Sequence, residues 1–165
     1  MRIVIADTGP IHYLLLVGHV DVLPALFEKV VIPSEVYAEL ARPEAPETVH
    51  NWIQAAPVWL EVRTQPSGPF EDESLESLDD GEKGALALAT SLAADLVIMD
   101  DRMGVRVARD KGFRVIGTLR VLQLGARRGL LDLADAFERI KRTNFRYRQD
   151  IMSELLSEQA ADERG

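Results

Sequence analysis

The sequence contains no cysteine and only three histidines. The missing cysteine excludes a disulfide scaffold, a thiolate metal site and a cysteine nucleophile. Because His12, His19 and His50 are widely separated, we do not expect a histidine zinc site or a Ser/His/Asp triad. Neither of the two common glycine-rich phosphate-binding motifs occurs, so the sequence does not predict a nucleotide-binding loop of either type.

Long apolar runs are also missing. The N-terminal run from Ile3 to Ala6 stops at Asp7, so it predicts neither a signal peptide nor a membrane span. We therefore expect a soluble, cytoplasmic protein without membrane contact. The 165 residues, 47% of them hydrophobic, can build one well-sized core. We expect a single domain over residues 1–165, in which helices at about 131–159 either complete the fold or form an appendage.

Charge is distributed unevenly along the chain. The net charge of −8 argues against a nonspecific nucleic-acid binder. Residues 102–148 nevertheless carry 13 Lys or Arg against 4 Asp or Glu. This basic stretch could hold a polyanion through its arginines. The alternative is that the arginines lie on solvated helix faces.

Short β-branched runs alternate with longer segments of helical periodicity, which predicts buried parallel strands and the helices that cover them. Strands are expected at 3–6, 30–32, 59–63, 96–99 and 114–116. Helices are expected at 10–17, 20–27, 34–41, 47–54, 79–94, 102–111, 118–127 (with Thr118 as the cap), 131–142 and 148–159. Residues 64–77 are expected to form an acidic loop. This alternation predicts a three-layer α/β/α fold with a mainly parallel central sheet.

Two of the expected strands end directly in aspartate, one before Asp7 and one before Asp100 and Asp101. In open parallel sheets the ligand site lies beyond the carboxyl ends of the strands. If the two strands are neighbours, their carboxylates repel each other by roughly 3 kcal/mol at a separation of about 5 Å. A hard divalent cation, Mg²⁺ or Mn²⁺, would offset that repulsion.

Two glutamates could join the same edge of the sheet. Glu82 is expected in the first turn of the helix at 79–94, and Glu39 lies in the helix at 34–41. The structural alternative for Glu82 is a capping box with Asp79. Glu39 could simply be a solvated helix residue, and the aspartates could be turn or N-cap residues.

Four segments of the sequence resemble a known family. They are residues 4–10 (VIADTGP), 31–40 (VIPSEVYAEL), 78–89 (LDDGEKGALALA) and 96–102 (LVIMDDR). In this order they resemble the PIN domain, and more closely the prokaryotic PIN-like proteins related to VapC-type toxins of toxin-antitoxin modules. The likeness runs from residue 1 to about residue 128, and the ordered set is more specific than any one motif.

The resemblance implies a Mg²⁺- or Mn²⁺-dependent endoribonuclease. The carboxylates that match the family's acidic positions are Asp7, Glu39, Glu82 and, after the next core strand, Asp100 or Asp101. We expect all of them to be catalytic and all except Glu39 to be metal ligands, with the Thr8 hydroxyl supporting the site. The chain departs from the commoner pattern by carrying Glu82 where aspartate is usual.

The expected partners follow from the same resemblance. RNA would be held by the basic stretch, with Arg102 and Arg106 closest to the carboxylates in sequence. VapC-like proteins commonly form homodimers and are neutralised by a small antitoxin that inserts into the active site. The expected activity is hydrolysis of RNA phosphodiester bonds.

Two alternatives remain at this point. Asp7 followed by Thr8 is also typical of haloacid-dehalogenase-type phosphatases, although the second aspartate of that class is missing two positions on. The other alternative is a catalytically inactive PIN-like interaction module, in which the carboxylates only cap helices.

Overall fold

The computed structural model describes residues 2–64 and 73–164. At its centre lies a five-stranded sheet with the strand order β3-β2-β1-β4-β5. The strands are β1 (Val4–Ala6), β2 (Val30–Pro33), β3 (Leu60–Arg63), β4 (Leu96–Ile98) and β5 (Val115–Ile116). All four pairs of neighbouring strands are parallel. The structure therefore confirms the predicted α/β fold, and the expected mainly parallel sheet is parallel across its described strands.

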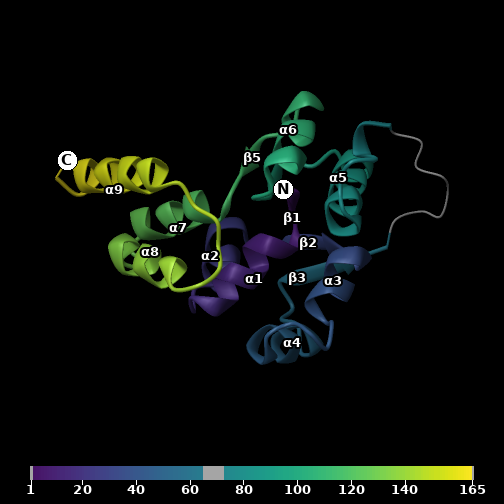
Figure 1. Cartoon of the computed structure of the whole chain (residues 1–165), viewed down its shortest axis with the longest axis horizontal. Coiled ribbons are helices and arrows are strands. Elements are labelled where there is room, and N and C mark those ends of the chain that lie inside the picture. Colours follow the sequence, from purple (N-terminus) through teal and green to yellow (C-terminus); the bar gives the residue numbers. More distant parts are fainter. Residues whose placement is uncertain (1, 65–72, 165) are drawn as a thin grey trace.

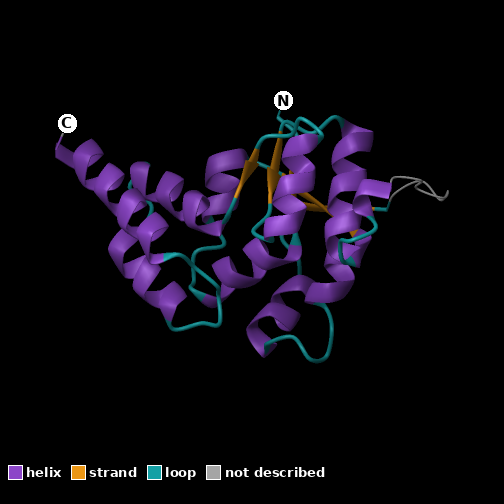
Figure 2. Ribbon diagram, turned by 45° about the horizontal axis from the view of Figure 1, so that its top comes forward, coloured by secondary structure: helices purple, strands orange, loops and turns teal. Residues whose placement is uncertain are grey.

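Alternating side chains of the strands fill two separate cores. Ile5, Val31 and Val97 are register partners and share one core with α5 (Asp80–Leu92) and α6 (Arg102–Asp110). The residues between them, such as Val4 and Ile98, point to the opposite face, because successive strand side chains alternate. That face is covered by α1 (Thr8–Leu16), α2 (Val22–Phe27) and α7 (Thr118–Arg127), which completes the three layers (Figures 1 and 2).

Several helices begin where a strand ends. α1 follows β1 through Asp7, α3 (Ser34–Leu40) follows β2 directly, and α7 follows β5 through Gly117. α4 (Glu47–Gln54) then leads from α3 to β3. Because the strands are parallel, these helix N-termini gather at one edge of the sheet. Positive ends of helix dipoles at that edge favour nearby negative charge.

The structure differs from the predicted elements in several places. The last helix, for example, continues to Arg164 rather than ending at residue 159. α1 begins at Thr8 rather than residue 10, because Asp7 is already extended and serves as its N-cap. Thr118 was expected to cap its helix, but the N-cap is Gly117, and the Thr118 hydroxyl binds a strand-end carboxylate instead. Of the predicted loop at 64–77, residues 65–72 lie outside the described residues, and Glu73–Leu75 forms a 3₁₀ turn, η1.

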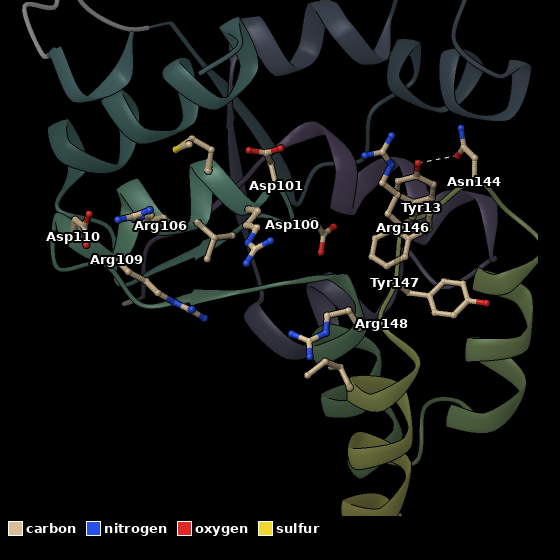
Figure 3. A pocket seen from close by; sticks show the side chains of 15 residues that line it. Tyr13, Asp100, Asp101, Arg106, Arg109, Asp110, Asn144, Arg146, Tyr147 and Arg148 are labelled. Carbon is tan, nitrogen blue, oxygen red and sulfur yellow. Dashed lines mark hydrogen bonds between the residues drawn. The ribbon is translucent and has the colours of Figure 1, made fainter. Parts of the chain in front are cut away.

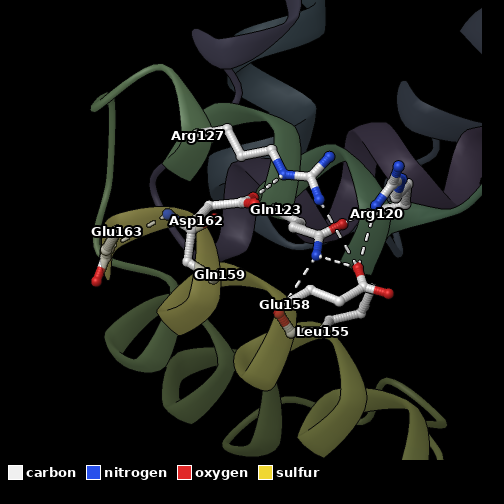
Figure 4. A network of polar contacts seen from close by, with 8 residues as sticks. All are labelled: Arg120, Gln123, Arg127, Leu155, Glu158, Gln159, Asp162 and Glu163. Atoms are coloured by element: carbon white, nitrogen blue, oxygen red, sulfur yellow. Dashed lines mark hydrogen bonds and ion pairs between the residues drawn. The ribbon is translucent and has the colours of Figure 1, made fainter. Parts of the chain in front are cut away.

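The last two helices, α8 (Leu133–Lys141) and α9 (Gln149–Arg164), pack beside α7. Phe137 of α8 and Met152 of α9 are buried in the same core as β1 and β4. A polar network also joins α9 to α7 (Figure 4): the buried Gln123 donates to the Leu155 carbonyl and to Glu158. Within residues 2–64 and 73–164, no helix combines the length and apolarity that crossing a membrane requires.

Candidate active site

The two strands that end in aspartate are neighbours, which the sequence had left as a condition. β1 pairs with β4 in parallel, with Ala6 opposite Ile98. The Asp7 amide donates to the Ile98 carbonyl at 2.9 Å, which places Asp7 next to the segment that leads to Asp100. The condition for the two strand ends to converge is therefore met.

Asp7 has the least satisfied carboxylate of the site. Asp7 is 7% exposed and its side chain makes no cap hydrogen bond. Its buried Oδ1 has no hydrogen-bond partner among residues 2–64 and 73–164. Burial raises the pKa of Asp7 to about 7. A hydrogen bond from the Thr8 backbone opposes this shift, while the charges of Asp79, Glu39 and Asp100 add to it. Negative charges thus surround a buried carboxyl, one oxygen of which accepts no hydrogen bond from the described part of the chain.

Glu39 links two helix N-termini. One of its oxygens accepts from the Thr8 hydroxyl at the start of α1, and the other accepts from the Gly81 amide in the first turn of α5 at 3.1 Å. A Cβ at position 81 would lie 2.7 Å from the Glu39 carboxylate oxygens, so a side chain there would displace the carboxylate from this position. Glu39 therefore lies beside the start of both α1 and α5, and the Thr8 hydroxyl binds it directly.

Glu82 has a structural role as well as a place in the site. Asp79 and Glu82 form the predicted capping box: the Glu82 amide donates to Asp79 at 2.8 Å, and the Asp79 amide donates to Glu82 at 3.2 Å. Glu82 is 7% exposed. Burial, followed by the charges of Asp79 and Asp101, raises the pKa of Glu82 to about 8.

Asp100 and Asp101 differ in their surroundings. Asp100 accepts two hydrogen bonds from Thr118, from the amide at 2.8 Å and from the hydroxyl at 2.5 Å. Burial raises the pKa of Asp100 against the effect of these bonds. Asp101 is exposed and caps α6 by accepting from the Gly104 amide at 3.0 Å. Asp100 acts electrostatically on Asp7 and Asp101 on Glu82, so both belong to the same cluster.

The donor chemistry of this cluster fits a hard divalent cation, because all of its candidate ligands are carboxylate oxygens. The buried Oδ1 of Asp7 is an atom that such a cation would satisfy. As the side chains stand, however, no three His, Asp or Glu groups among residues 2–64 and 73–164 are arranged to hold a metal ion. The carboxylates share one edge of the sheet without forming a completed ligand set.

Arg102 and Arg106 of α6 line a cleft that Asp100 and Asp101 also line. Figure 3 shows Arg106 and the two aspartates in this cleft. Among residues 2–64 and 73–164 neither arginine forms an ion pair within 4.0 Å. The expected cationic groups are therefore placed next to the carboxylates.

Sequence reasoning missed two contributors to the site. Asp79 was considered only as a helix cap, yet its charge acts on both Asp7 and Glu82. Thr118 was also considered only as a cap. In an open parallel sheet the ligand site lies beyond the carboxyl ends of the strands. Because β5 lies beside β4, this rule points to the residues that follow β5 as well as to Asp7 after β1.

The fold and the site together define a class: a parallel α/β/α domain with clustered carboxylates at the carboxyl edge of its sheet. The family model DUF3368, a PIN domain, matches residues 3–161, and the chain belongs to this PIN-domain family. PIN domains have a nuclease fold, and nuclease activity in this family generally depends on a metal ion. A comparison with the curated proteins found no match. Family membership confirms the predicted resemblance to the PIN domain and disfavours the aspartyl-phosphatase alternative. The closer relationship to VapC-type toxins stays a prediction.

Proposed function

We propose that this protein is a Mg²⁺- or Mn²⁺-dependent endoribonuclease. The observation that carries the proposal is the buried Asp7 carboxylate, with an unpartnered oxygen and three further carboxylates acting on it. Such an arrangement is costly without a cation and stable with one. If the acidic cluster only capped helices, we would expect the Asp7 side chain to form a cap hydrogen bond. It forms none, although it is buried.

Asp7, Glu82, Asp100 and Asp101 would hold the cation. A bound divalent cation lowers the pKa of water and neutralises a scissile phosphate. The chain's own residues prepare that chemistry. Thr118 fixes both oxygens of Asp100, and the capping box fixes Glu82. Glu39, held between Thr8 and Gly81, adds negative charge beside Asp7.

We also propose that the protein acts as a VapC-like toxin in the cytoplasm, as a homodimer neutralised by a small antitoxin. The sequence resemblance supports this finer assignment. The shared core that joins α8 and α9 to the sheet supports treating residues 1–165 as one functional domain.

The test is cleavage of a mixed RNA pool by metal-free protein to which Mn²⁺ or Mg²⁺ is added back. We expect the wild type to cut only with the metal and Asp7→Asn to be inactive. Asp21→Asn is the matched control, because Asp21 is exposed and its side chain makes no cap hydrogen bond. Induced expression should arrest growth with the wild type and Asp21→Asn, and should not with Asp7→Asn.

The alternative is an inactive interaction module, and one observation favours it: Asp79, Glu82 and Asp101 all take part in helix capping. If the protein is such a module, calorimetric titration should find no Mn²⁺ binding by the wild type that is lost in Asp7→Asn. Absence of both cleavage and metal binding in the wild type would overturn the nuclease proposal in favour of the module.

A further inference from the structure

A cleft of about 1620 Å³ runs beside the candidate active site, and two cationic walls face each other across it. α6 forms one wall through Arg102, Arg106 and Arg109. The opposite wall is the connection between α8 and α9, residues 144–148, which we call the C-terminal wall. Figure 3 shows Asp100 and Asp101 between the two walls.

The C-terminal wall is anchored to α1. The Tyr13 hydroxyl donates to Asn144 Oδ1 at 2.8 Å, and the Phe145 ring packs edge to face against Tyr13 at 4.9 Å between centroids. The Phe145 amide donates to the Thr143 hydroxyl at 3.1 Å. Because α1 begins immediately after Asp7, these contacts place the wall relative to the carboxylates.

Most guanidinium groups of the cleft have no acidic partner in the part of the chain that the structure describes. Among residues 2–64 and 73–164, no ion pair within 4.0 Å involves Arg102, Arg106, Arg109 or Arg146. Arg148, by contrast, pairs with Asp150 at 2.7 Å, and arginines outside the cleft, such as Arg127 and Arg139, are also paired. Unpaired guanidinium groups keep the donors that bind phosphate.

The same cleft exposes apolar side chains. Met103 is 47% exposed, Tyr147 is 40% exposed and Ile151 is 36% exposed. Cationic groups interleaved with an accessible ring and apolar side chains match the chemistry of single-stranded nucleic acid, whose phosphates take the charges and whose bases take the apolar surface. A duplex does not offer its base faces for such contacts, because they remain stacked within the helix.

We propose that the C-terminal wall completes the RNA-binding surface beside the carboxylates, with Arg146 contacting a phosphate opposite Arg106 and Tyr147 stacking on an unpaired base. The inference rests on the proposed function, in which this RNA is the substrate. RNA is favoured over a protein partner because the unpaired arginines stand directly beside a candidate nuclease centre.

The test measures binding separately from cleavage. A labelled single-stranded RNA of about 12 nucleotides is titrated by fluorescence anisotropy in EDTA at several salt concentrations. Arg106→Ala and Arg146→Ala should each reduce the slope of log affinity against log salt by about 0.7, and the double variant by about 1.4. Arg114→Ala is the matched control, because Arg114 is exposed and precedes β5, at the opposite edge of the sheet.

Tyr147 has a different signature, since stacking involves no counterion release. Tyr147→Ala should weaken binding roughly 5- to 100-fold with an unchanged salt slope, and Tyr147→Phe should retain the wild-type affinity. A duplex of the same sequence should bind at least tenfold more weakly than the single strand. These variants change exposed side chains, and their thermal unfolding should match that of the wild type.

The outcomes separate this inference from the proposed function. If Arg146→Ala keeps the wild-type salt slope, or Tyr147→Ala the wild-type affinity, the inference is overturned while metal-dependent cleavage can still stand. Equal affinity for the duplex would also overturn it. Absence of RNA binding would also overturn the inference and would leave the cleft as a candidate protein-binding surface. If RNA binds as expected but no metal produces cleavage, the inference stands and the nuclease proposal fails.

Discussion

At the scale of single residues, the carboxyl of Asp7 is held in conditions that suit its neutral form. It is buried, and the nearest charges that act on it are negative. Its pKa of about 7 in the folded chain exceeds the value of about 3.9 expected for an unfolded aspartate. The folded chain therefore binds this proton more tightly. The stabilisation is fully present below about pH 3.9 and is lost as the pH rises through about 7.

We predict that the free energy of unfolding of the metal-free protein depends on pH through Asp7. Between pH 5 and 8, Asp7 should reduce the stability of the wild type by roughly 2 to 3 kcal/mol relative to Asp7→Asn, because the variant has no proton to lose. Glu82, with its pKa of about 8, adds a loss of the same sign that extends to higher pH. Urea unfolding in EDTA at a series of pH values measures the difference.

Comparing variants removes the contributions of other groups. Burial lowers the pKa of His12, so its contribution has the opposite sign and is lost as the pH falls. This contribution is common to all the variants and cancels in the difference. Asp21→Asn should follow the wild type. Parallel stability curves for Asp7→Asn and the wild type would show that Asp7 is not held in its neutral form.

At the scale of elements, the N-terminus of α5 serves two purposes that conflict. The Asp79 side chain caps the helix, and its charge acts against Asp7 and Glu82. A cap stabilises a helix whether or not it is charged, whereas the repulsion grows only when the neighbouring carboxyls ionise. Two substitutions at this one position can therefore separate the cap from the charge.

We predict that Asp79→Asn and Asp79→Ala respond differently to pH. Asparagine retains the cap and removes the charge, so in EDTA its stability should match the wild type at pH 5 and exceed it at pH 9 by about 1 kcal/mol. Alanine removes the cap and should be less stable at pH 5 by roughly 0.5 to 2 kcal/mol. Chemical unfolding at the two pH values measures both effects. An asparagine variant that tracks the wild type at pH 9 would contradict the repulsion.

Local patterns allowed much of the fold to be predicted. The β-branched runs located the strands, and the spacing of Asp79 and Glu82 identified the start of α5. The role of Thr118 was missed because it depends on β5 lying beside β4, which is a property of the whole sheet. The C-terminal wall was missed for a similar reason, since Asn144 meets Tyr13 across 131 positions of the chain.

At the scale of the whole molecule, the uneven distribution of charge becomes a spatial arrangement. The acidic cluster lies at the strand ends, and arginines of the basic stretch line the cleft beside it. The C-terminal wall immediately precedes α9. Glu158 and Asp162 of α9 hold this helix against α7 by accepting hydrogen bonds from Gln123 and Arg127 (Figure 4). The position of the wall should therefore depend on contacts that lie outside the cleft.

We predict that Glu158→Ala loosens α9 and weakens RNA binding without changing the cleft's charged groups. Glu158 accepts from the buried Gln123 at 2.8 Å and pairs with Arg120 at 3.6 Å, and losing these contacts should destabilise the docking of α9 by about 1 kcal/mol. Hydrogen exchange should show faster exchange in α9 with the sheet unaffected. RNA affinity should fall, and the slope of log affinity against log salt should stay nearly constant, since every phosphate-binding arginine remains.

Glu154→Ala, which removes an exposed carboxylate from the same helix, is the control for lost charge. If both variants exchange and bind alike, α9 does not position the wall.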